Sequence, residues 1–122
     1  MNILHLTIKK KFFDMIASGE KLEEYRSVKP YWITRLCWHE FRLYKPNDII
    51  NLVVGKQLKK ENVIKCKFYD AVEFKNGYSK ASPTMLVEFK GLDIGEAKPE
   101  WSDNWKGDVF RIKLGEVYTV SR

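Results

Sequence analysis

Three charged side chains, Lys21, Glu24 and Arg26, fall within six residues of sequence, directly after a segment whose pattern predicts a helix. In such a cluster a carboxylate can activate water, while the two cations hold developing negative charge or a phosphate. Glu23 and Glu24 favour the charged form of Lys21, so this lysine suits oxyanion stabilisation better than proton abstraction. Two other interpretations remain open: a Lys21–Glu24 ion pair that braces the loop, and a solvated charged face beside a helix end.

The elements around this cluster follow from local pattern. Between residues 9 and 18, apolar residues three and four apart predict one apolar helical face: Phe12, Met15 and Ile16. Gly19 fits the left-handed position that ends a helix. The chain after Gly19 is predicted to become extended at Tyr25, which would place Glu24 and Arg26 on one side of a strand.

The rest of the chain predicts mostly strands. Residues 3–8 alternate as a half-buried strand should, with His5 facing outward, and residues 84–90 repeat that alternation. Pro30 predicts the start of a second helix that runs to about Phe41, whereas residues 47–62 fit a helix or a strand equally. Alternation over residues 110–114 predicts a C-terminal strand, with a bulge or bend at Gly115-Glu116 before residues 117–120. Because a strand lies near each terminus, a curled antiparallel barrel is favoured over an open parallel sheet.

Two sequence blocks resemble a known family. The string Gly19-x-Lys21-x-x-Glu24-x-Arg26, preceded by residues 4–8 and a short amphipathic helix, resembles the signature of the ASCH family within the PUA-like superfamily. Residues 73–80, followed by the strand predicted at 84–90, also resemble small ASCH proteins of bacteria and their phages. Residues 38–67 depart from the pattern and read as an insertion.

This resemblance implies a fold and a ligand site. The fold would be an α+β, β-rich PUA-like pseudobarrel of mostly antiparallel strands with two or three flanking helices, formed by a single domain over residues 1–122. Its ligand cleft would lie between the barrel and the first helices, with Lys21 directed into it. Some small ASCH proteins resemble amidohydrolases that deacylate N4-acylated cytidine with the motif lysine and a threonine three positions later. Glu24 takes the threonine position here, which argues against that mechanism.

The resemblance and the residues together predict a binding function. We expect RNA or a modified nucleoside to bind in a basic cleft lined by the Gly19-x-Lys21-x-x-Glu24-x-Arg26 motif. The expected ligand contacts are Gly19 and the segment around the predicted Asn76-Gly77 turn: Lys75, Asn76, Tyr78 and Lys80. Trp101 and Trp105 could add a stacking wall, although packing is the commoner role for tryptophan. The alternative is a small hydrolase of a modified nucleoside, or a ribonuclease, with Lys21, Glu24 and Arg26 at its centre. An adaptor for another protein is a third hypothesis.

The composition of the chain favours some of these functions over others. The chain carries 22 Lys and Arg against 16 Asp and Glu, a net charge of +6, which favours partners that bear phosphate. Cys37 and Cys66 fit reduced thiols better than a disulfide, and Cys37-x-His39 lacks a second ligand pair for zinc. No glycine-rich phosphate loop and no run of about eighteen apolar residues occurs. We therefore expect no cofactor, no metal and no membrane partner, and a cytoplasmic location.

Overall fold

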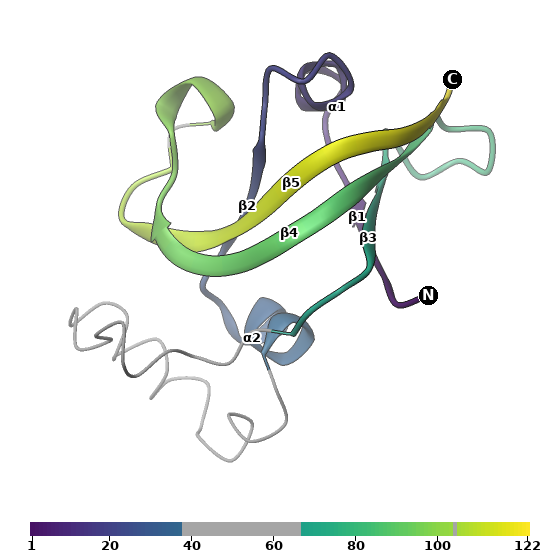
Figure 1. The fold of residues 1–122 in the computed structure, drawn as a ribbon. Coiled ribbons are helices and arrows are strands. Elements are labelled where there is room, and N and C mark those ends of the chain that lie inside the picture. Colours follow the sequence, from purple (N-terminus) through teal and green to yellow (C-terminus); the bar gives the residue numbers. More distant parts are fainter. Residues whose placement is uncertain (38–66, 104) are drawn as a thin grey trace. The chain divides into compact units, whose positions relative to one another are not determined.

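A computed structural model describes residues 1–37, 67–103 and 105–122 of the chain (Figure 1). The elements, in chain order, are the following: β1 (Ile3–Thr7), α1 (Lys10–Ala17), β2 (Glu23–Ser27), α2 (Pro30–Leu36), β3 (Ala71–Lys75), β4 (Thr84–Glu96), the 3-10 helix η3 (Pro99–Trp101) and β5 (Asp108–Ser121). The predicted strand-rich α+β fold is confirmed. The ambiguous segment 47–62, together with Trp38 and Cys66, lies outside the described residues.

The five strands form one mixed sheet in the order β1-β3-β4-β5-β2. β1 pairs parallel with β3, so that Leu4 lies opposite Val72, and β3 pairs antiparallel with β4, so that Val72 lies opposite Val87. Parallel neighbours need a long connection between them, and here residues 8–70 separate β1 from β3. The sequence analysis favoured antiparallel strands, and the alternating patterns did not predict this parallel pair.

Chain contacts divide the molecule into two compact units, each with its own buried residues. The first unit comprises Met1–Glu24, Phe68–Gly91 and Ile112–Arg122. Its core is supplied by α1 and by the strands, and the largest enclosed apolar side chains are Leu4, Phe13, Ile16, Phe74, Met85 and Ile112. Alternate residues of β4, namely Met85, Val87 and Phe89, are buried as the sequence predicts.

The second unit comprises Tyr25–Lys67 and Leu92–Arg111. Among its described residues, the buried apolar side chains are Tyr25, Ile33, Leu36, Cys37, Trp101, Val109 and Phe110. The strands β2, β4 and β5 each contribute residues to both units. Burying these side chains removes apolar surface from water, which stabilises each unit at about 25 cal/mol per Å².

The second helix ends earlier than predicted. α2 begins at Pro30 as expected, but Cys37 is already extended, with φ −108° and ψ 151°. The prediction that this helix runs to about Phe41 is therefore wrong. The carbonyl of Leu36 accepts a hydrogen bond from the Lys67 amide at 2.8 Å, which gives it a strand-like partner in place of a helical one.

The two long strands exceed their predicted lengths. β4 extends past Lys90 to Glu96, and β5 continues through Gly115 and Glu116 as one element. A Cβ built on Gly115 would collide with Glu88 Oε1, and the Glu116 amide donates to that same oxygen at 3.1 Å. Gly115 thus gives a β4 carboxylate room to lie against β5.

Candidate functional site

The charged motif begins at a helix end that Gly19 shapes. Gly19 has φ +82°, and its amide donates to Ile16 O at 3.0 Å, while Lys21 N donates to Met15 O at 3.0 Å. A Cβ at Gly19 would meet no atom within 4 Å. The requirement for glycine is therefore conformational and does not arise from crowding. This turn directs Lys21 back toward α1.

Lys21 and Glu24 form a buried ion pair in the first unit. Lys21 Nζ lies 3.0 Å from Glu24 Oε1, and the side chains are 1% and 6% exposed. The Lys21 ammonium also lies 3.9 Å from the ring centroid of Phe12, a cation–π contact with α1. Both charges are therefore compensated inside the unit, and the pair ties the end of α1 to the start of β2.

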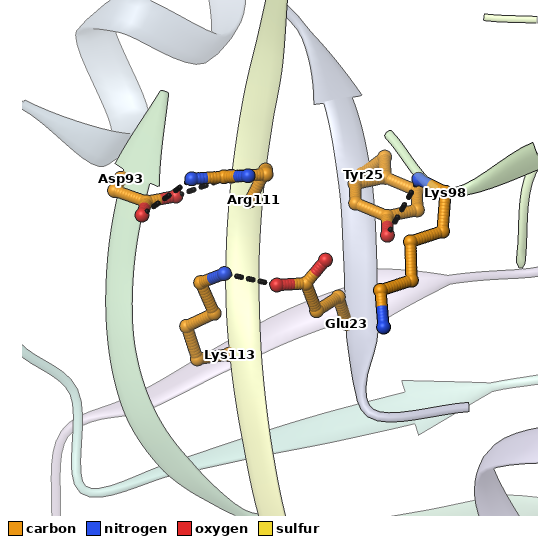
Figure 2. A network of polar contacts seen from close by, with 6 residues as sticks. All are labelled: Glu23, Tyr25, Asp93, Lys98, Arg111 and Lys113. Carbon is orange, nitrogen blue, oxygen red and sulfur yellow. Dashed lines mark hydrogen bonds and ion pairs between the residues drawn. The ribbon is translucent and has the colours of Figure 1, made fainter. Parts of the chain in front are cut away.

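Neighbouring residues fix the same segment to β5. Glu23 on β2 pairs with Lys113 on β5 (Figure 2). At the adjoining positions, Leu22 O accepts a hydrogen bond from the Leu114 amide at 3.0 Å. Glu23 is 9% exposed as a residue, so its carboxylate is also largely withdrawn from water. The motif segment is thus held by two ion pairs, Lys21–Glu24 within the segment and Glu23–Lys113 to β5.

Arg26 contacts other residues, in the second unit. Its Nη1 donates to Tyr25 O at 2.8 Å, and its Cζ lies 5.2 Å from the ring of Trp32 on α2. Arg35 Cζ lies 5.2 Å from the same ring, and Arg35 Nη1 donates to Tyr31 OH at 3.1 Å. We call these four residues, Arg26, Tyr31, Trp32 and Arg35, the Arg–Trp surface.

The Arg–Trp surface contains residues that the sequence analysis did not select. Pro30 marks the start of α2, which places both Tyr31 and Arg35 in the helix. Residues four positions apart in a helix lie on one face, where their side chains can meet. That spacing is a usable signal for their contact. Nothing local in the sequence indicates that Arg26, on a strand, lies over Trp32.

The predicted ligand residues around Asn76 form the connection between β3 and β4. Lys75 ends β3, and Asn76 N donates to Pro83 O at 3.0 Å, which closes the turn. Gly77 has φ +112°, as the turn interpretation requires. Tyr78 is 92% exposed, and Lys80 is also exposed. The connection therefore presents an aromatic ring and a cation to solvent.

The described part of the chain was also compared with the requirements of a metal site. Over residues 1–37, 67–103 and 105–122, no three His, Cys, Asp or Glu side chains gather as a metal site would require. His5 Nδ1 lies 3.0 Å from Glu73 Oε1 across β1 and β3. Cys37 is fully buried, whereas His39 lies outside the described residues.

Two further observations bear on function. No helix within the described ranges is both long enough and apolar enough to cross a bilayer. Comparison with protein-family models, curated proteins and solved structures gives no match for this chain.

Proposed function

We propose that this protein binds RNA or a modified nucleoside, and that the Arg–Trp surface makes the principal contact. The observation that carries the proposal is the placement of two guanidinium groups, those of Arg26 and Arg35, each 5.2 Å from the one indole ring of Trp32. Guanidinium groups offer planar, forked donors that match phosphate oxygens. Tyr31, 62% exposed beside them, adds an aromatic face for a base.

Electrostatics favours an anionic ligand at this surface. Two cations held against one ring repel each other, and a bound phosphate would reduce that repulsion. The chain's net charge of +6 attracts polyanions as well. In the first unit, we assign the Lys75–Lys80 connection a separate contact with the ligand, in which Tyr78 stacks on a base while Lys75, Asn76 and Lys80 face phosphate.

The resemblance to the ASCH family supports the same proposal, with the chain as a cytoplasmic PUA-like module. In this proposal Lys21 and Glu24 act by positioning the motif segment, since both are nearly inaccessible. Gly19 acts likewise by ending α1. Arg26 is the motif residue that meets the ligand.

Salt-dependent titration of a labelled single-stranded RNA tests the proposal. Arg26→Gln with Arg35→Gln removes two cations from the Arg–Trp surface, and Lys9→Gln with Lys90→Gln removes two exposed cations elsewhere. Each phosphate contact on a single strand contributes about 0.7 to the slope of log K against log salt. We expect the arginine pair to lower that slope by about 1.4 and the lysine pair to leave it nearly unchanged.

Either of two results would overturn the proposal. One is an absence of RNA binding at low salt. The other is an equal loss of affinity and slope in both double variants, because the effect would then reflect net charge alone.

A second candidate function is hydrolysis of a modified nucleoside at the Lys21–Glu24 pair. It is favoured by the 3.0 Å approach of an ammonium and a carboxylate in a setting that excludes most water, where electrostatic stabilisation is strongest. Turnover of N4-acylated cytidines, followed by chromatography, tests it with Lys21→Met and Glu24→Gln. Loss of turnover in both variants, with the fold intact, would support catalysis. Turnover retained in both would exclude this mechanism.

A further inference from the structure

A groove in the second unit lies at η3, outside the Arg–Trp surface, and its lining includes Trp105, which the sequence analysis named as a possible stacking residue. It has a volume of about 540 Å³ and is lined by Pro99, Ser102, Trp105 and Lys106. Sites for small molecules commonly enclose about 300–1,000 Å³ and combine an aromatic wall with a few polar groups. This groove has that size and that kind of lining.

The wall of the groove is held in place by a set of local contacts. Tyr25 OH accepts a hydrogen bond from the Lys98 amide at 3.1 Å, which fixes the start of the segment (Figure 2). Ser102 Oγ donates to Lys98 O at 3.0 Å, and Trp101 is buried, with Lys98 Nζ 4.4 Å from its ring centroid. A preorganised wall loses little conformational entropy when a ligand binds.

Trp105 and Lys106 are the aromatic and the charged member of this lining, and a ligand can reach both. Trp105 is 41% exposed, in contrast to the buried Trp101, and Lys106 is exposed next to it. An indole face can stack on any nucleobase, and a lysine ammonium can hold a phosphate as a point charge. These two neighbours therefore supply the recognition that a base joined to a phosphate needs.

The charge of the segment indicates how many phosphates it can accept. Residues 98–108 contain two lysines, Lys98 and Lys106, and three acidic residues, Glu100, Asp103 and Asp108. A polyanion would meet repulsion from the carboxylates, whereas one phosphate needs only one nearby ammonium. The segment therefore suits a single phosphate better than a nucleic-acid backbone.

We propose that the groove lined by Pro99, Ser102, Trp105 and Lys106 binds a nucleoside monophosphate, with its base stacked on Trp105 and its phosphate on Lys106. This site is independent of RNA binding at the Arg–Trp surface. It adds a small-molecule ligand to a protein whose proposed function is recognition of nucleic acid or of a modified nucleoside.

The test follows the four tryptophan indole N–H signals by NMR during titration with AMP and with CMP at millimolar concentrations. Trp105→Phe assigns the Trp105 signal. We expect that signal to shift saturably and the signal of buried Trp101 to move less. Absence of any saturable shift at Trp105 would overturn the proposal.

Variants separate the two halves of the ligand, with affinities measured by calorimetry. Trp105→Leu should weaken AMP binding by at least about fivefold, while Tyr118→Leu, at a similarly exposed aromatic, should leave it unchanged. Lys106→Gln should weaken AMP several-fold but not adenosine, with Lys90→Gln as the matched control. Equal AMP affinity in the wild type, Trp105→Leu and Lys106→Gln proteins would place the ligand elsewhere and overturn the proposal.

Two additional titrations distinguish this site from the Arg–Trp surface and from simple anion binding. Arg26→Gln with Arg35→Gln should retain AMP binding even where RNA binding is lost, so either proposal can fail alone. Inorganic phosphate should not reproduce the Trp105 shift. If phosphate alone gave the same shift and the same affinity, recognition of a base would be excluded.

Discussion

Lys21 Nζ lies 3.0 Å from Glu24 Oε1, and the two side chains keep only 1% and 6% of their surface exposed. Leu22, between them in sequence, is 48% exposed, so the apolar residue faces water while its charged neighbours are enclosed. This inversion of the usual pattern is possible because each charge has a partner, and Phe12 adds its ring to the ammonium. The ion pair and the ring contact therefore fix the end of α1 to the start of β2.

Removing one member of this pair should be strongly destabilising. Lys21→Met leaves the Glu24 carboxylate buried without its ammonium, and we expect a loss of about 3–5 kcal/mol in the free energy of unfolding. Adding Glu24→Leu to Lys21→Met should recover much of this loss, because no uncompensated charge then remains. Urea denaturation with linear extrapolation measures both values.

The exposed Lys10–Asp14 pair on α1 provides the control for that experiment. Its side chains are 77% and 38% exposed, and Lys10→Met should barely move the urea midpoint. An unchanged midpoint in Lys21→Met as well would show that the buried pair contributes no stability.

Gly19 should tolerate asparagine better than alanine. Its φ of +82° lies in the left-handed region, where an alanine costs about 1–2 kcal/mol and an asparagine less. No atom lies within 4 Å of a Cβ at this position, so crowding should add nothing. The free energy of unfolding of Gly19→Ala and Gly19→Asn measures the difference. Equal losses in the two variants would mean that the conformation of this residue is not the cause.

The sequence predicts the features of this fold that depend on residues close together in the chain. The left-handed Gly19 and the alternation in β1 and β4 are local, and these are confirmed. The predicted apolar face of α1 is confirmed at Phe12 and Ile16, whereas Met15 is half-buried and Phe13 is buried in its place. Gly77 has φ +112°, as its place in the predicted turn requires, but the connection between β3 and β4 is longer than two residues and spans residues 76–83.

Features that depend on register between distant segments could not be predicted in this way. The parallel pairing of β1 with β3 joins residues nearly seventy positions apart, and the Glu23–Lys113 pair spans ninety. The same limit applies to Arg26 over Trp32, and to the end of α2 at Leu36, whose carbonyl bonds to Lys67. A charged cluster in the sequence therefore does not reveal which of its members are enclosed by the fold.

Gly95 should act by making room for Arg111. Arg111 forms a bidentate salt bridge with Asp93: Nε donates to Oδ1 at 2.7 Å, and Nη2 donates to Oδ2 at 2.8 Å (Figure 2). A Cβ on Gly95 would lie 2.5 Å from Arg111 Cζ, so Gly95→Ala must displace the guanidinium. We expect a loss of about 1 kcal/mol from the free energy of unfolding.

A double-mutant cycle isolates that cause. In an Arg111→Ala background the guanidinium is absent, and Gly95→Ala should then cost much less than it does in the wild type. Equal costs in both backgrounds would show that Gly95 is required for a reason other than Arg111.

Acid should weaken the attachment of Arg122 to α1. Hydrogen bonds from Lys10 first, and then from Arg122, hold the pKa of Asp14 below its ordinary value of 3.8. Because the folded pKa is lowered, this carboxylate contributes its full stability above the unfolded pKa and loses it as pH falls through the folded pKa.

The thermal midpoint of the wild type should therefore fall more on acidification below 3.8 than that of Asp14→Asn, which has no such charge to lose. Arg122→Gln should lie between the two, since Lys10 still bonds to Asp14 at 2.9 Å. Parallel acid profiles in all three proteins would exclude Asp14 as a source of the pH dependence.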